Sequence, residues 1–78
     1  MKLWIVRARD GHDVWNPWYD KAFGFVVRAG TEEEARTLAS FVHGAEGREP
    51  WLDATASTCE ELTGDGAAEV VMADVHNA

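Results

Sequence analysis

Three aromatic residues and a proline are concentrated in one short polar stretch near the N-terminus. Trp15, Pro17, Trp18 and Tyr19 all lie within residues 11–20, which read GHDVWNPWYD. Because glycine, asparagine, proline and aspartate disfavour a continuous helix or strand, this stretch is predicted to be part of a loop over residues 9–20. Large aromatic side chains on a loop either fill the edge of a small core or form a recognition surface. A chain of only 78 residues has a small core. Whether these aromatic side chains lie in the core or on the surface therefore constrains the fold.

Two segments of alternating β-forming residues flank the loop. Residues 2–8 place Trp4 and Val6 on one face, and residues 21–29 place Phe23 and Phe25 on one face. Both segments are therefore predicted to be strands. Gly24 lies opposite the two phenylalanines, which predicts a bulge there or the close approach of another backbone or ring.

The clearest predicted element is a helix that begins after Thr31. Thr31 and Glu34 have the spacing of a capping box, and three consecutive glutamates place negative charge at the positive end of the helix dipole. Gly44 is the predicted stop. The face expected to cover a sheet follows i, i+3, i+4, i+7 spacing and consists of Ala35, Leu38, Ala39 and Val42.

The second half of the chain predicts two further strands. Residues 51–53 are expected to return to the core as a short extended piece or an anchor, and Asp53 is placed to cap a single turn over residues 54–57. Residues 57–62 form the third predicted strand, and a turn at residues 64–66 follows it. Residues 68–76 are apolar on both faces and are therefore predicted to be a central strand.

These elements predict a small single α+β domain over residues 1–78, with the order β-β-α-β-β. A mostly antiparallel sheet of three or four strands with one helix packed on one face satisfies this order. The opposite face of the sheet then needs cover. The aromatic loop and a second copy of the protein are the two candidates.

The net charge of −7 is unevenly distributed along the chain. Residues 1–29 contain five basic and three acidic residues, whereas residues 30–78 contain two basic and eleven acidic residues. A negative field of this kind repels polynucleotides and anionic membranes and favours basic partners. The simpler interpretation is that the charge maintains solubility.

The sequence contains no signal that directs the chain to a membrane or out of the cell. No apolar run approaches the roughly 18 to 20 residues needed to cross a bilayer, and the apolar run at the start is too short for a signal peptide. Cys59 is the only cysteine, which excludes an internal disulfide and agrees with a reducing cytosol. We therefore expect a cytoplasmic protein.

Catalytic and metal-binding patterns are weak. Cys59 would need a neighbouring base to act as a nucleophile, and nothing in the sequence places His12, His43 or His76 beside it. There is no glycine-rich phosphate loop and no HExxH motif. The acidic loop residues Asp10, His12, Asp13 and Asp20 do not match a calcium-loop spacing. We expect a protein that is not an enzyme and that uses no metal and no cofactor.

Three binding functions fit these observations. In the first, the protein mimics a nucleic acid: its carboxylates bind a basic groove of a partner, and the aromatic side chains of the loop stabilise the complex. In the second, the same aromatics stack on a small nucleotide while Arg7, Arg9 or Arg28 holds its phosphates. In the third, the protein is a scaffold that forms a homodimer through its sheet. The first is the leading hypothesis, and its expected contact residues are Trp15, Trp18, Tyr19, Glu32, Glu33, Glu34, Glu60 and Glu61.

Four stretches of the chain resemble a family of short uncharacterised proteins found in bacteriophages and prophages. They read NPWYDKAFGFVVRA (residues 16–29), TEEEAR (31–36), WLD (51–53) and STCEEL (57–62). The resemblance implies a viral accessory gene expressed in a bacterial cytoplasm. By analogy of size and charge, it implies an anti-CRISPR-like inhibitor whose partner is a host defence protein or complex with a basic surface. Direct binding to polynucleotides or membranes is not expected.

Overall fold

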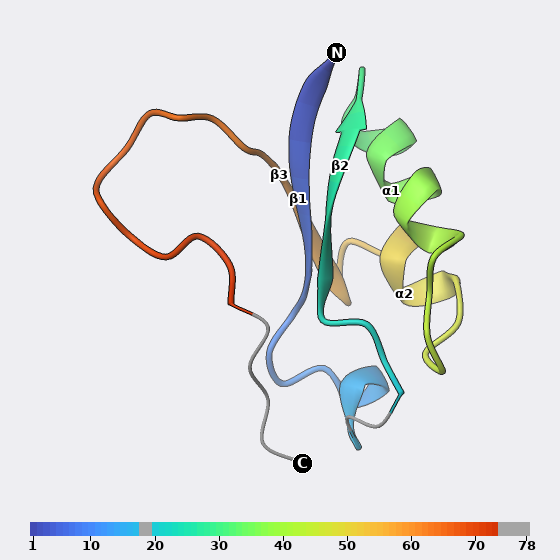
Figure 1. Ribbon diagram of the computed structural model, residues 1–78. Helices are drawn as coiled ribbons and strands as arrows, with labels where there is room; N and C mark the ends of the chain where they lie inside the picture. The colour runs from blue at the N-terminus through green and yellow to red at the C-terminus, as the bar shows by residue number, and fades with distance from the viewer. Residues whose placement is uncertain (18–19, 74–78) are drawn as a thin grey trace.

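The computed structural model describes residues 1–17 and 20–73. Within them, two helices cover one face of a three-stranded antiparallel sheet of order β2-β1-β3 (Figure 1). A short 3-10 helix, η1 (Asp13–Trp15), lies in the loop between the first two strands. The predicted α+β class with a mostly antiparallel sheet is confirmed. The strands are β1 (Lys2–Ala8), β2 (Gly24–Ala29) and β3 (Ser57–Glu61), and the helices are α1 (Glu32–Ser40) and α2 (Glu49–Leu52).

The register of the central strand assigns each side chain to one of two faces. Val6 of β1 pairs with Phe25 of β2 and with Cys59 of β3, and all three pack in or against the core beneath the helices. We call this side of the sheet the helix face. Ile5 pairs with Val26 and Glu60, and because neighbouring residues along a strand alternate, these three lie on the opposite side, the open face.

The start of α1 is built as predicted. Thr31 Oγ1 accepts a hydrogen bond from the Glu34 backbone N–H at 3.2 Å, and Glu34 Oε1 accepts one from the Gly30 N–H at 2.8 Å. These bonds satisfy donors that a helix N-terminus leaves free. The helix ends at Ser40, with Phe41 as its C-cap, four residues before the predicted stop at Gly44.

The predicted buried face of α1 is wrong at two of its four positions. Ala35 and Ala39 are buried, but Leu38 and Val42 are 45% and 66% exposed. Arg36 and Ser40 are buried in their place. The helix packs closely enough on its small alanines that the adjacent positions, rather than the bulkier apolar ones, point into the protein.

Burial of Arg36 is possible because hydrogen bonds satisfy its guanidinium group. Nη1 donates to Ser57 Oγ at 2.8 Å and to the Trp51 carbonyl at 3.1 Å, while Nη2 donates to the Ser57 carbonyl at 3.1 Å. Nε forms an ion pair with Glu32 at 3.1 Å. A buried charge is tolerated when it is paired in this way. The side chain therefore links α1 to α2 and to the start of β3.

Aromatic rings form the centre of the core. The ring centroids of Trp15 and Trp51 are 4.9 Å apart, and Phe25 approaches Trp51 edge-on at the same distance. Trp51 is fully buried, so it is an anchor as predicted, although it lies in the short helix α2 instead of an extended piece. The expected turn at Asp53 is present, and its Oδ1 accepts hydrogen bonds from the Thr55 backbone and hydroxyl groups.

The predicted fourth strand is absent from the described residues. Residues 68–73 have no strand structure, and the remainder of that prediction, residues 74–76, lies outside the described residues. The second strand begins at Gly24, three residues later than predicted. Both sides of β1 are already paired, and the chain after β3 crosses the open face instead of joining an edge of the sheet. Of the apolar side chains in this segment, Met72 packs on Gly24, whereas Val70 is 80% exposed.

The open face is covered in part by residues 62–73, which we call the C-terminal arch. Figure 1 shows the arch leaving the end of β3, curving away from the sheet and returning towards it. The close approach predicted at Gly24 is confirmed, because the Met72 side chain and the Val6 carbonyl lie against this residue. The aromatic loop was one of the two candidates for this cover, but its Trp15 packs with the core on the helix face. In the described part of the chain, no helix reaches the length and apolarity needed to cross a bilayer.

Candidate functional site

Trp15 is a core residue and not a surface anchor, contrary to its expected role in partner binding. Only 3% of its surface is exposed, and its Nε1 donates to the Ala56 carbonyl at 2.8 Å. The physical reason is the turn of η1, which His12 caps by accepting a hydrogen bond from the Val14 N–H. This turn directs the indole towards Trp51. The other two expected anchors, Trp18 and Tyr19, lie outside the described residues.

The three glutamates at the start of α1 are exposed, as expected, but they have different local roles. Glu32 is paired with Arg36, and Glu34 accepts a hydrogen bond from the Gly30 N–H. The Glu33 carboxylate has no hydrogen bond or ion pair with any residue that the structure describes. Glu33 is therefore the member of this group that is most available to a partner.

The two glutamates of β3 lie on different sides of the sheet. Glu60 pairs with Ile5 on the open face, whereas Glu61 follows the alternation of the helix face and forms an ion pair with Lys2 at 3.2 Å. The structure therefore does not gather the predicted acidic residues into one row. It places them on both sides of the β3 edge.

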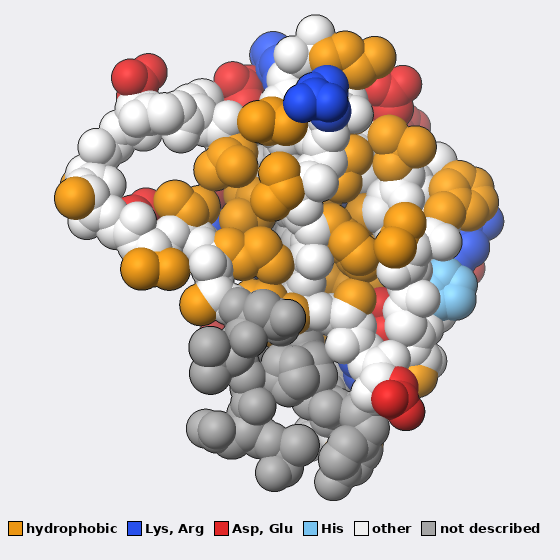
Figure 2. Space-filling view, in the orientation of Figure 1, with side chains coloured by type: hydrophobic (Ala, Val, Ile, Leu, Met, Phe, Trp, Pro, Cys, Tyr) orange, Lys and Arg blue, Asp and Glu red, His pale blue; other side chains and the backbone are white. Residues whose placement is uncertain are grey.

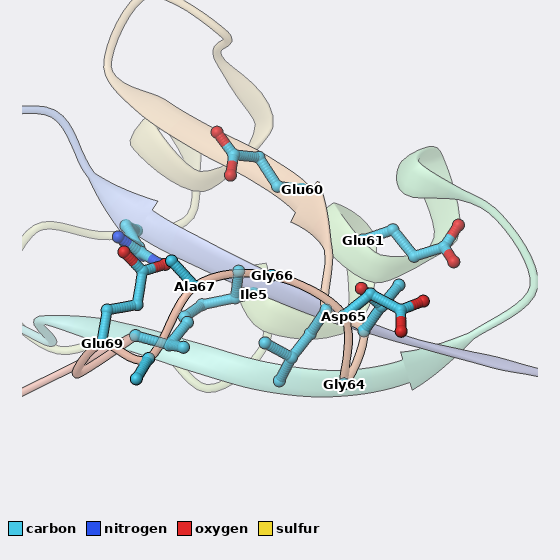
Figure 3. A pocket seen from close by; sticks show the side chains of 13 residues that line it. Ile5, Glu60, Glu61, Gly64, Asp65, Gly66, Ala67 and Glu69 are labelled. Atoms are coloured by element: carbon cyan, nitrogen blue, oxygen red, sulfur yellow. The ribbon is translucent and has the colours of Figure 1, made fainter.

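A hollow of about 390 Å³ lies between the C-terminal arch and the open face. Figure 2 shows the arch standing away from the rest of the molecule, with hydrophobic side chains gathered over the adjacent sheet. Four acidic residues and Arg7 are among the residues that line the hollow, and Figure 3 shows the carboxylates spread around Ile5 rather than converging. The side chains that define it are Ile5, Arg7, Glu60, Glu61, Leu62, Asp65, Glu69 and Val71.

Asp65 and Glu69 belong to the acidic excess that the sequence showed but were not among the eight expected contact residues, and the apolar residues of this hollow were not predicted at all. The sequence does carry a signal for the turn at residues 64–66, which lets the chain reverse direction. It carries no signal that distinguishes a crossing of the open face from a paired strand. A segment that crosses a sheet and a strand that joins it can have the same alternation of side chains and the same apolar content. The hollow therefore could not be predicted from the sequence, because it depends on the tertiary structure.

The arginines that a bound nucleotide would need do not come together. Arg7 lines the hollow beneath the arch among four carboxylates, and Arg28 lies at the opposite end of the β1–β2 pairing. Arg9 Nε donates to the Ala54 carbonyl at 3.1 Å. A second hollow, of about 270 Å³, contains Arg9, but Asp10 and Asp13 line it as well. These carboxylates oppose the binding of a phosphate.

Cys59 lies on the helix face, half-buried against the core. Burial raises the pKa of the Cys59 thiol, and the negative charges of Glu32 and Glu60 act in the same direction, while Arg36 opposes them. The thiol is therefore disfavoured as a thiolate, which is the form that reacts as a nucleophile. Among the described residues, no group of three or more histidine, cysteine or acidic side chains is arranged to hold a metal ion.

Comparison of the chain with protein-family models, with curated proteins and with solved structures gives no match in any of the three.

Proposed function

We propose that this protein acts by binding, without catalysis, and that it docks on a basic surface of another protein. The observation that carries this proposal is the number of carboxylates that have no basic partner. Within residues 1–17 and 20–73 there are two ion pairs, Lys2–Glu61 and Glu32–Arg36. The acidic side chains left without an ion pair on α1, β3 and the arch are those of Glu33, Glu34, Glu60, Asp65 and Glu69.

The open face supplies apolar contact area next to these charges. Leu3 and Val26 lie on this face and are 40% and 54% exposed. Val70 of the arch is 80% exposed. Charge complementarity mainly raises the rate of association and selects the partner, whereas desolvated apolar groups slow dissociation. A basic partner with apolar residues among its charges would use both features.

The resemblance to phage and prophage proteins gives this binding a biological setting. In a bacterial cytoplasm, the basic surface would belong to a host defence protein or complex that uses it to hold nucleic acid. The protein would then act as an inhibitor by occupying that surface, as an anti-CRISPR protein does. Trp18 and Tyr19 stay predicted anchors in this proposal, and Trp15 does not.

Capture from a bacterial lysate that contains active defence complexes tests this function. The immobilised full chain is used as bait at low and at high salt, beside a variant that carries Glu33→Gln, Glu60→Gln, Asp65→Asn and Glu69→Gln. These substitutions remove charge but little volume, and none of the four side chains forms a hydrogen bond or ion pair in the described structure. Salt-sensitive capture of a nucleic-acid-binding protein by the native chain alone supports the proposal. Equal capture by both chains, or none, contradicts it.

Self-association through the open face is a second candidate function. The exposed Leu3, Val26 and Val70 side chains favour it, because apolar surface of this kind is often covered in an assembly. The net charge of −7 opposes it, since two copies repel each other. Sedimentation equilibrium at several salt concentrations separates the candidates, because a dimer held by the open face would become tighter as salt screens that repulsion.

A further inference from the structure

We propose that the hollow between the C-terminal arch and the open face receives an extended segment of the partner in which basic residues alternate with aliphatic ones. This inference rests on the proposed function, because it identifies the part of the surface that contacts the basic partner. It also states the chemistry of the segment that binds there. Three features of the hollow carry it: apolar side chains in its floor, an acidic rim and a wall whose backbone groups form no hydrogen bond to other described residues.

The floor of the hollow contains apolar side chains, although most of its exposed lining is polar. Ile5 is 3% exposed, so the arch and the sheet already shield it from water, and Leu62 and Val71 line the space beside it. The volume of about 390 Å³ lies within the range of about 300–1,000 Å³ that is typical of ligand pockets. Aliphatic side chains of a partner would be removed from water on this floor.

The rim of the hollow is acidic. Glu60, Asp65 and Glu69 have no ion pair with any described residue, whereas the Glu61 side chain follows the helix face of β3 and pairs with Lys2. Arg7 is the one basic side chain among the lining residues. The carboxylates are dispersed around Ile5, so they would meet several cations spaced along a segment rather than a single ion (Figure 3). Charge complementarity therefore selects a segment with repeated basic residues.

The wall formed by the arch has unpaired backbone groups. Leu62 N–H donates to the Leu3 carbonyl at 2.9 Å, but residues 63–73 make no hydrogen bond with any other residue that the structure describes. Their N–H and C=O groups are open to an extended peptide, which could pair with them as an added strand does. In an extended segment, alternate side chains point to opposite sides. One set would face the apolar floor and the other would face the acidic rim.

An NMR titration tests the inference. The probe is a short capped peptide in which lysine alternates with valine, and the control peptide replaces valine with serine at unchanged charge. The proposal predicts saturable shifts of the Ile5, Leu62 and Val71 methyl signals with the valine peptide. It predicts about tenfold weaker binding of the serine peptide, because that peptide supplies the charges without the apolar contacts.

Two double variants with the same change in net charge locate the binding surface. One variant combines Glu60→Lys and Glu69→Lys in the rim, and the matched control combines Asp10→Lys and Glu49→Lys, two exposed positions that do not line the hollow. Folding of both is checked from their amide spectra. The proposal predicts about tenfold weaker peptide binding for the rim variant and a change of less than about twofold for the control, because close like charges repel more strongly than distant screened ones.

The outcomes separate this inference from the proposed function. Equal weakening in the two double variants, or shifts centred on α1, would overturn the hollow as the binding site while leaving salt-sensitive capture of a basic partner intact. No binding of the valine peptide to the native chain would also overturn it. Loss of salt-sensitive capture in the lysate experiment would remove the proposed function itself.

Discussion

The terminal methyl group of Met72 lies directly against Gly24, at the point where the C-terminal arch returns to the open face. A methyl group at position 24 would occupy the place of the Met72 side chain and would lie 2.7 Å from the Val6 carbonyl oxygen. The absence of a side chain at Gly24 therefore allows Met72 of the arch to pack on β2, next in sequence to Val71, which lines the hollow. This contact connects the second strand of the sheet to the surface that we propose binds a partner.

Substitution Gly24→Ala is expected to destabilise the protein by about 1–3 kcal/mol, because the added methyl group overpacks against the Val6 carbonyl and displaces Met72. Urea unfolding measures the change. Gly64→Ala is the matched control, since nothing lies within 4 Å of a methyl group at that position. A stability for Gly24→Ala equal to that of the control would show that the arch does not pack on this strand.

Substitution Trp15→Ala is expected to destabilise the protein by about 3–5 kcal/mol, because it leaves a cavity beside Trp51. Thermal unfolding followed by circular dichroism measures the loss. Leu38→Ala, at a side chain that is 45% exposed, is the control and should change the stability by less than about 1 kcal/mol. Unchanged stability of Trp15→Ala with weakened partner capture would instead identify Trp15 as a surface anchor.

Substitution Arg36→Met is expected to cost about 1–3 kcal/mol of stability, because it removes the guanidinium donors to the buried carbonyl groups of Trp51 and Ser57 and leaves Trp51 only the longer bond from Ser57 Oγ. Glu32→Gln should cost less than about 1 kcal/mol, since the Glu32 side chain is about half exposed and its ion pair is screened. Denaturant unfolding of both variants makes the comparison. A larger loss for Glu32→Gln would mean that the ion pair, and not the hydrogen bonds, secures Arg36.

The thiol of Cys59 is expected to react slowly with iodoacetamide at pH 8. Burial raises its pKa above the ordinary value of 9.0, so the thiolate is rarer in the folded chain than in the chain unfolded in urea. As the pH rises, the unfolded thiol ionises first. The stability that this group contributes is therefore complete below pH 9 and is lost as the pH rises through the folded pKa. Faster alkylation of the folded chain than of the unfolded chain would indicate an activated nucleophile.

Sequence patterns predicted local structure well where the signal is itself local. The capping box of Thr31 and Glu34 involves neighbours in the chain, and it forms at the predicted place. Leu38 and Arg36 show the limit of such patterns. The spacing of hydrophobic residues predicted that Leu38 would be buried, but Arg36 is buried instead. Its guanidinium group can be buried because Ser57 and Trp51 supply hydrogen-bond acceptors, which come close to it only in the folded chain.

The candidate site was predictable in charge but not in geometry. The excess of acidic residues after position 30 indicated a basic partner, and Glu60 was among the predicted contacts. The role of Trp15 in the core depends on its contact with Trp51, which is distant in sequence. The hollow depends on the path of residues 62–73 across the open face, and an apolar segment gives no indication of whether it will cross a sheet or join it.

The salt dependence of partner binding is the decisive measurement of whether this protein docks on a basic surface through its carboxylates. With the captured partner in hand, its affinity for the native chain and for a Glu60→Gln, Glu69→Gln variant is measured from low to high salt. Our account predicts that the native chain binds more tightly at low salt and that its affinity falls more steeply as salt rises, because the variant has lost two of the charges that face the partner. Identical salt dependence of the two chains would contradict it.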